Sequence, residues 1–134
     1  MRAVLDPNVL ISALLSRDGT PAQLIALWLR GEFELIVSPQ LLDELERALA
    51  HPKIRARLDE DAASKFLDLL HAAAVPAEDV EPRSRSADPA DDYLIALAEH
   101  NRAILVSGDK DLLDLGPALP IENPARFLTR LSGA

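Results

Sequence analysis

The sequence predicts a three-layer α/β/α domain in which helices cover both faces of a central parallel sheet of four to five strands. Two observations carry this prediction. Short apolar runs of strand length alternate along the chain with segments whose apolar residues recur at helical spacing, an order typical of parallel sheets. The chain has 134 residues, of which 49% are hydrophobic, enough for one packed core. We therefore expect a single domain over residues 1–134.

The first half of the chain has clear start and stop signals for these elements. An apolar run that ends at Asp6 predicts a buried strand, and helical spacing resumes from Asn8. Pro21 suits the first turn of a second helix, which ends at Gly31. Ser38 followed by proline is a helix N-cap signal. The expected strands are 2–6 and 33–37, and the expected helices are 8–15, 21–30 and 39–50.

The second half is less regular. Pro52 breaks the third helix, and Pro76 interrupts a weak third strand. The Ala-Ile-Leu-Val-Ser run at 103–107 is the clearest interior strand of this half. The remaining expected elements are helices over 54–58, 61–74, 89–101, 112–113 and 124–131, strands over 75–80 and near Ile121, and a polar loop over 81–87.

The composition narrows the classes of function. The chain has no cysteine, which excludes disulfides and thiolate metal sites. No apolar stretch reaches the roughly 20 residues of a membrane span, and the N-terminus shows no signal-peptide pattern, so we expect a cytoplasmic protein without membrane contact. The formal net charge of −8 disfavours a basic nucleic-acid-binding face, unless clustered acids hold divalent cations that offset part of it.

Several catalytic fingerprints are absent. The sequence has no G-x-x-x-x-G-K phosphate loop, no G-x-G-x-x-G and no G-x-S-x-G elbow, so nucleotide-binding and serine-hydrolase hypotheses lack their motifs. The three histidines do not pair at ligand spacing. The acidic residues are therefore the better candidates for chemistry.

Two acids follow buried strands. Asp6 follows the first strand, and Asp109 follows the strand over 103–107. Because the carboxyl ends of parallel strands open onto the ligand crevice, we expect both acids at one edge of the sheet. Converging carboxylates repel one another unless a cation lies between them, and oxygen ligands suit Mg²⁺ or Mn²⁺. The alternative is that each acid only caps the helix that follows it.

Helical periodicity sorts the acids that lie within helices. In the helix that Pro89 opens, Asp91 lies on the apolar stripe, whereas Asp92 points to the side and is expected to be solvated. In the helix after Ser38, Glu44 and Glu46 lie on the two borders of the apolar stripe. Periodicity therefore does not decide which of the two glutamates points toward the site.

Four segments, in this order and at these separations, resemble the PIN domain, a metal-dependent ribonuclease fold found in toxins of bacterial and archaeal toxin–antitoxin pairs. They are Val4–Ser12, Ser38–Leu45, Asp88–Asp92 and Leu105–Leu113. The resemblance covers nearly the whole chain and implies a PIN-like, Rossmann-like fold. One departure is Pro7, where the family usually has a small hydroxyl residue. Proline fixes φ and removes a backbone donor, which affects how Asn8 approaches the site.

The resemblance also implies the site. It selects Glu44 over Glu46, and it leaves Asp92 as the rival of Asp91, since Asp92-Tyr93-Leu94-Ile95-Ala96 also resembles the family pattern. The implied catalytic residues and ligands of Mg²⁺ (or Mn²⁺) are Asp6, Glu44, Asp91 and Asp109. The implied supporting residues are Asn8 and Ser107, through hydrogen bonds, and Asp92 and Asp111.

The implied activity is metal-dependent hydrolysis of RNA phosphodiester bonds, as the toxin of a type II toxin–antitoxin pair. The expected partners are RNA, an antitoxin that docks on the apolar helices around 24–29 and 54–70, and further copies of the chain in a homodimer or higher homo-oligomer. Lys110, Arg17 and Arg102 are expected nearest the site to meet phosphates.

Two other functions remain to be weighed. A catalytically weak or inactive PIN module that acts through protein binding is favoured by the acidic balance and disfavoured by the intact set of four acids. A structure-specific DNA nuclease is disfavoured because such relatives carry insertions that this short chain lacks.

Overall fold

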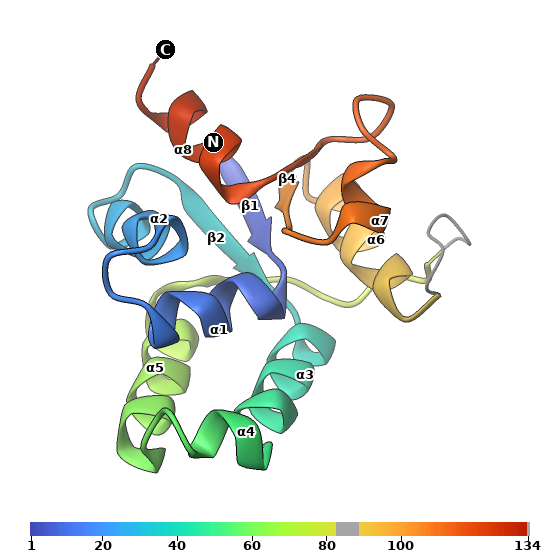
Figure 1. Cartoon of the computed structure of the whole chain (residues 1–134). Coiled ribbons are helices and arrows are strands. Elements are labelled where there is room, and N and C mark those ends of the chain that lie inside the picture. The colour runs from blue at the N-terminus through green and yellow to red at the C-terminus, as the bar shows by residue number, and fades with distance from the viewer. Residues whose placement is uncertain (83–88, 134) are drawn as a thin grey trace.

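A computed structural model describes residues 1–82 and 89–133 of the chain. Its five strands are all parallel and form one sheet in the order β3-β2-β1-β4-β5 (Figure 1). The predicted α/β class and the parallel sheet are thereby confirmed. The strands are β1 (Arg2–Leu5), β2 (Glu34–Val37), β3 (Val75–Pro76), β4 (Ile104–Val106) and β5 (Ile121–Glu122).

The helices lie close to their predicted positions. In the described part of the chain, one 3-10 turn, η1 (Pro89–Asp91), directly precedes α6 (Asp92–His100). No helix in residues 1–82 and 89–133 has both the length and the apolarity needed to cross a bilayer. The helices are α1 (Pro7–Leu15), α2 (Thr20–Leu29), α3 (Pro39–Leu49), α4 (Pro52–Arg55), α5 (Glu60–Ala73), α6 (Asp92–His100), α7 (Lys110–Leu113) and α8 (Pro124–Leu131).

The third strand is shorter than the range 75–80 that the sequence predicts. It covers two residues at the edge of the sheet. Pro76 has no N–H to donate, and the pairing with β2 ends where the backbone N–H of Ala77 donates to the carbonyl of Val37. The predicted polar loop over 81–87 lies mostly outside the described residues.

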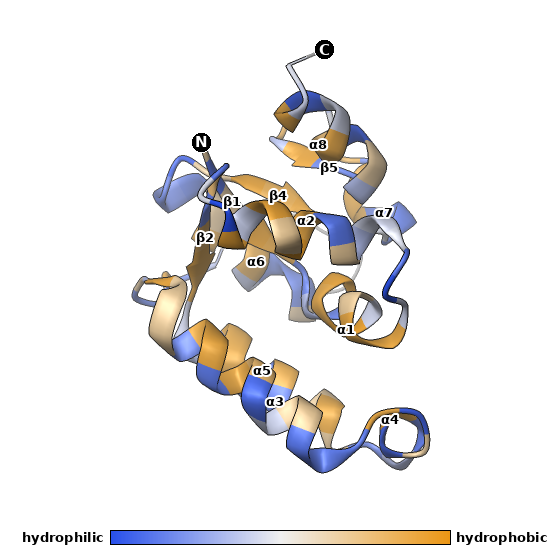
Figure 2. Ribbon diagram, turned by 90° about the vertical axis from the view of Figure 1, so that its left-hand side faces the viewer, coloured by the Kyte–Doolittle hydropathy of each residue, from blue (hydrophilic) through white to orange (hydrophobic). Residues whose placement is uncertain are grey.

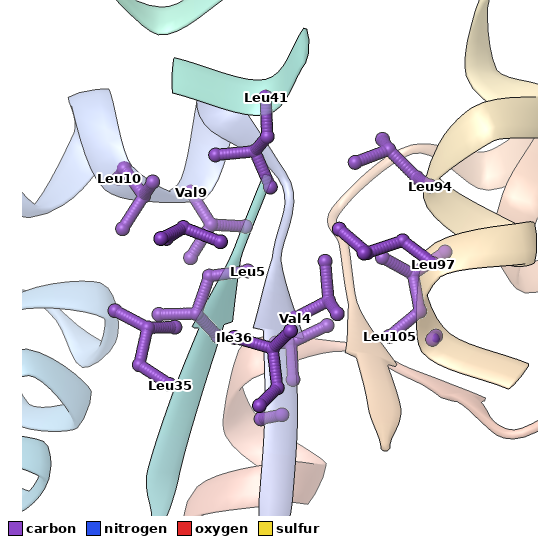
Figure 3. Packing of buried hydrophobic residues seen from close by; sticks show 14 of the residues in the cluster. Val4, Leu5, Val9, Leu10, Leu35, Ile36, Leu41, Leu94, Leu97 and Leu105 are labelled. Atoms are coloured by element: carbon purple, nitrogen blue, oxygen red, sulfur yellow. The ribbon is translucent and has the colours of Figure 1, made fainter. Parts of the chain in front are cut away.

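The central strands are covered on both faces. Figure 3 shows Leu94 and Leu97 of α6 on one side of β1 and Val9 and Leu10 of α1 on the other. All four side chains are buried, and the interior strand β4 is orange, that is hydrophobic, in Figure 2. After Arg2, the residues of β1 are apolar and fully buried whichever face they point to, as expected of an interior parallel strand.

Pro7 occupies the first position of α1, directly after the N-cap Asp6. An N–H at this position has no partner within the helix, and the φ of proline is already helical. The backbone N–H of Asn8 still reaches the Asp6 carboxylate at 2.9 Å. The departure at Pro7 therefore leaves the start of the helix intact.

Candidate active site

Asp6 lies at the carboxyl end of β1, in the middle of the sheet, and its side chain is 5% exposed. Its backbone N–H donates to the carbonyl of Val106 at 2.9 Å, so the pairing of β1 with β4 continues to this residue. Oδ1 of Asp6 accepts from the backbone N–H of Asn8. Oδ2 accepts from the hydroxyl of Ser107 at 2.8 Å. Both carboxylate oxygens are thus fixed.

Ser107 links Asp6 to Asp109. The serine follows β4, is fully buried, and accepts through Oγ from the backbone N–H of Asp109 at 3.0 Å. Oδ1 of Asp109 accepts from the backbone N–H of Asp111 at 3.0 Å and caps α7. Asp6 and Asp109 therefore do cap helices, as the alternative hypothesis predicted, and they also share one hydroxyl between two adjacent strand ends.

The Asp6 carboxyl is destabilised in its ionised form. Burial raises the pKa of Asp6 above its ordinary value of 3.8, and the negative charge of Asp109 raises it further. The hydrogen bonds from Asn8 and Ser107 act in the opposite direction, but burial dominates. Among the ion pairs within the described residues, none joins a cation to Asp6 or Asp109. The pair is an uncompensated negative charge inside the fold.

Of the other two predicted ligands, Glu44 contacts Tyr93, and Asp91 influences the same tyrosine through its charge. The hydroxyl of Tyr93, on α6, donates to Oε2 of Glu44, on α3. Burial and then this hydrogen bond and the charge of Glu44 raise the pKa of Tyr93 far above its ordinary value, with smaller contributions from the charges of Asp6 and Asp91. The phenol stays protonated and donates. From the sequence, Tyr93 is expected only to pack, and its polar role is missed.

The prediction that Asp92 is solvated is wrong, since its side chain is 4% exposed. Asp92 is the first residue of α6 and lies on the side that it shares with Ile95 and Glu99, as periodicity predicts. That side is covered rather than exposed, because α6 is buried over most of its surface. Asp91, by contrast, is partly exposed and acts on Tyr93. Asp92 faces a separate hollow that is lined by Val80, Glu81, Asp92, Ile95, Ala96, Glu99 and His100.

The two glutamates that periodicity left open differ in position. Glu44 is partly buried beside Tyr93. Glu46 is exposed and lines a different groove, with Leu42 and Pro76, on the side of α3 that faces β3. Among the described residues, it is Glu44 of the two that hydrogen bonds to Tyr93 on α6.

A hollow of about 360 Å³ opens beside Asp6 and Asp109, and we call it the acidic hollow. Arg102 was predicted near it, but that prediction is wrong. The residue precedes β4 and so lies at the amino end of the strand, whereas Lys110 directly follows Asp109. The acidic hollow is lined by Asp6, Asn8, Val9, Ser12, Pro21, Gly108, Asp109 and Pro124.

The four predicted ligands do not form one cluster. Within the part of the chain that the structure describes, no three His, Cys, Asp or Glu side chains lie close enough together to hold a metal ion. Asp6 and Asp109 are joined through Ser107, and Glu44 is tied to Tyr93, whose phenol also senses Asp91. The donors of both groups are oxygen atoms, which fit Mg²⁺ or Mn²⁺.

The fold and this edge define a parallel α/β domain with an acidic site at the carboxyl ends of its central strands. The chain belongs to the PIN domain family, since a family model described as "PIN domain" matches residues 2–111. The predicted resemblance is thereby confirmed.

Known proteins resemble the chain over most of its length. The relative "Uncharacterized protein MJ1680" of Methanocaldococcus jannaschii is 30% identical over 118 residues, which cover 86% of this chain and 75% of that protein. Among solved structures, PAE2754 from Pyrobaculum aerophilum matches with a TM-score of 0.69 at 21% identity, covering 100% of this chain and 91% of that one. VapBC2 from Rickettsia felis, bound to a DNA fragment from their promoter, matches at 0.67 and 16% identity, covering 92% and 98%. The two structures share the fold of this chain.

Proposed function

We propose that the protein is a metal-dependent endoribonuclease and the toxin of a type II toxin–antitoxin pair. The observation that carries the proposal is the buried, uncompensated Asp6 carboxylate beside Asp109 at the carboxyl ends of the two central strands. Burying a charge without a partner costs free energy, and a divalent cation would remove that cost. Membership of the PIN family supports a nuclease.

Asp6, Glu44, Asp91 and Asp109 are the proposed ligands of Mg²⁺ or Mn²⁺. A cation bound there would polarise the scissile phosphate and lower the pKa of an attacking water. The burial of Asp92 in a different hollow favours Asp91 as the third ligand. Asp92 then supports the start of α6 rather than the ion.

The surrounding residues would hold the ligands and the RNA. The hydrogen bond from Ser107 and the backbone N–H of Asn8 fix the two oxygens of Asp6. The backbone N–H of Asp111 orients Asp109. The exposed Lys110 directly follows Asp109, which lines the acidic hollow, and is suited to meet a phosphate oxygen.

The proposed protein partner is an antitoxin, and further copies of the chain would complete the assembly. The likeness to VapBC2 supports a partner of this kind. Leu29 on α2 is 52% exposed, which suits the predicted docking region around residues 24–29. A basic partner would also offset the net charge of −8.

A second function is favoured by one observation. Because no three acids are assembled for an ion among the described residues, the chain also fits a catalytically weak or inactive PIN module that acts through protein binding. The two functions differ in what a divalent cation does to the purified protein.

Cleavage of a mixed pool of structured and unstructured RNAs separates them. The wild type would be assayed with Mg²⁺, with Mn²⁺ and with EDTA, beside Asp6→Asn and the control Asp43→Asn. Asp43 lies exposed on α3, pairs with Arg47, and lines the groove beside β3 rather than the acidic hollow. We expect metal-dependent cutting by the wild type and the control, and none by Asp6→Asn. Silence of the wild type with both metals, and no Mn²⁺ binding by calorimetry, would favour the inactive module.

A further inference from the structure

The hydrogen bond between Tyr93 and Glu44 joins α6 to α3. Glu44 on α3 and Asp91 directly before α6 are two of the four proposed ligands. Tyr93 is the second residue of α6 and follows Asp91 and Asp92, while Glu44 lies in the middle of α3. The two residues are 49 positions apart in sequence. This contact therefore depends on the tertiary fold and relates Glu44 to the end of η1, where Asp91 lies.

The ring and the hydroxyl of Tyr93 have different environments. The residue is 5% exposed and belongs to the hydrophobic core, so its ring is held by packing. A buried tyrosine hydroxyl normally requires a polar partner. Within residues 1–82 and 89–133, the partner that the structure gives it is Oε2 of Glu44. The hydroxyl of Tyr93 is therefore held in place by the packed ring and donates to the carboxylate of Glu44.

The carboxylate of Glu44 has one oxygen engaged by this bond. A carboxylate has two oxygens and about four acceptor positions, so a single hydrogen bond to Oε2 leaves Oε1 able to bind an ion. A glutamate side chain also has large rotamer freedom, which is lost when it binds. If Tyr93 restricts Glu44 when the protein folds, less freedom remains to be lost on ion binding.

We propose that Tyr93 is a positioning residue, whose hydroxyl holds Glu44 by Oε2 so that Oε1 can complete the divalent-cation site. The proposal rests on the proposed metal site but adds a residue that the four acids do not include. Hydrogen-bond partners of ligating carboxylates orient the ligand, and their loss typically weakens metal affinity roughly 10–100-fold. Two other roles of the hydroxyl predict different effects on Mn²⁺ affinity. The hydroxyl could serve only to pair a buried polar group, or it could compete with the ion for Glu44.

The test is Mn²⁺ binding to the full chain without RNA, measured by calorimetry and by electron paramagnetic resonance. Tyr93→Phe keeps the buried ring and removes only the donor. We expect its Kd for Mn²⁺ to rise roughly 10–100-fold, with a folded fraction equal to that of the wild type. An unchanged Kd would make the hydroxyl merely structural, and a lower Kd would make Tyr93 a competitor of the ion. Either result overturns the proposal.

A double-mutant cycle with Glu44→Gln shows whether the effect passes through Glu44. If Tyr93 acts by holding this carboxylate, Tyr93→Phe changes the Kd much less when residue 44 is glutamine than in the wild type. Equal effects in both backgrounds overturn the positioning role. Failure of the wild type itself to bind Mn²⁺ is a separate outcome, because it removes the proposed metal site and this proposal with it.

Discussion

The hydroxyl of Ser107 donates to Oδ2 of Asp6 at 2.8 Å, although the two residues are 101 positions apart. The parallel register pairs Leu5 with Val106, so the next residue of each strand lies at the same edge of the sheet. The acidic edge is therefore built by strand pairing rather than by a loop. Sites on rigid elements are held more closely than sites on loops.

Ser107→Ala is expected to destabilise the protein. The substitution removes the donor to a buried carboxylate oxygen, and leaving such an acceptor unsatisfied costs roughly 1–3 kcal/mol. Urea unfolding in EDTA measures the change. The control is Ser64→Ala at an exposed position of α5, which should stay within about 0.5 kcal/mol of the wild type. Equal effects of the two variants would contradict a structural role for the Ser107–Asp6 bond.

Asp6→Asn is expected to stabilise the metal-free protein at neutral pH. The pKa of Asp6 is raised in the folded state, chiefly by burial, so the folded protein binds this proton more tightly than the unfolded chain. The free energy of unfolding therefore falls as pH rises from the ordinary pKa of 3.8 through the raised value. Asparagine keeps the acceptor for the N–H of Asn8 and carries no charge.

Thermal unfolding of both proteins in EDTA, from acidic to neutral pH, checks this. The difference in Tm should be small at the acidic end and should grow in favour of Asp6→Asn as pH rises. Added Mn²⁺ should raise the Tm of the wild type more than that of the variant, since only the wild type keeps the proposed ligand. A wild type that gains stability relative to Asp6→Asn as pH rises in EDTA would contradict the burial effect.

Much of the fold was predictable because its signals are local. Ser38 caps α3 as predicted, the closing helix covers the predicted range 124–131, and the apolar strands could be predicted from their length and composition alone. The placement of Asp6 and Asp109 at one edge also followed from a general rule on parallel strands. This rule predicts which residues lie at the same edge of the sheet. It does not predict which side chains hydrogen bond to one another there.

The errors at Asp92 and Tyr93 arose where a contact is not local. The side of α6 that carries Asp92 is covered by the fold, and periodicity within one helix does not show which sides other segments cover. The partner of Tyr93 lies on another helix, so the sequence could suggest only that a buried tyrosine needs some acceptor. Arg102 precedes β4, so the order of the sequence already places it at the amino end of that strand, opposite the acids.

Asp91→Asn and Asp92→Asn are expected to have different effects. The charge of Asp91 acts on Tyr93 beside Glu44, whereas Asp92 lies in another hollow. We expect Asp91→Asn to weaken Mn²⁺ binding and to abolish RNA cleavage. Asp92→Asn should mainly change the free energy of unfolding. Loss of Mn²⁺ binding in Asp92→Asn alone would make Asp92 the third ligand instead.

Pro7→Ser restores the residue type that the resemblance leads one to expect. Proline at the first helical position restricts the unfolded chain, so its replacement should lower the free energy of unfolding by about 0.4–1 kcal/mol. The bond from the N–H of Asn8 to Asp6 does not involve the side chain of residue 7. Mn²⁺ affinity should therefore be unchanged, as calorimetry can measure. A large change in affinity would show that Pro7 shapes the site.

Lys110→Ala is expected to weaken RNA binding more than it slows the chemical step. Lys110 is exposed and directly follows Asp109, so it is suited to contact a phosphate near the proposed site. Losing one phosphate contact should raise KM several-fold across RNA sequences and reduce the slope of log affinity against log salt by roughly one. The matched control is Arg102→Ala, which removes an exposed cation at the opposite edge of the sheet. Equal losses in the two variants would mean that RNA senses only the net charge of the protein, and a loss confined to Arg102→Ala would place the substrate at the amino ends of the strands.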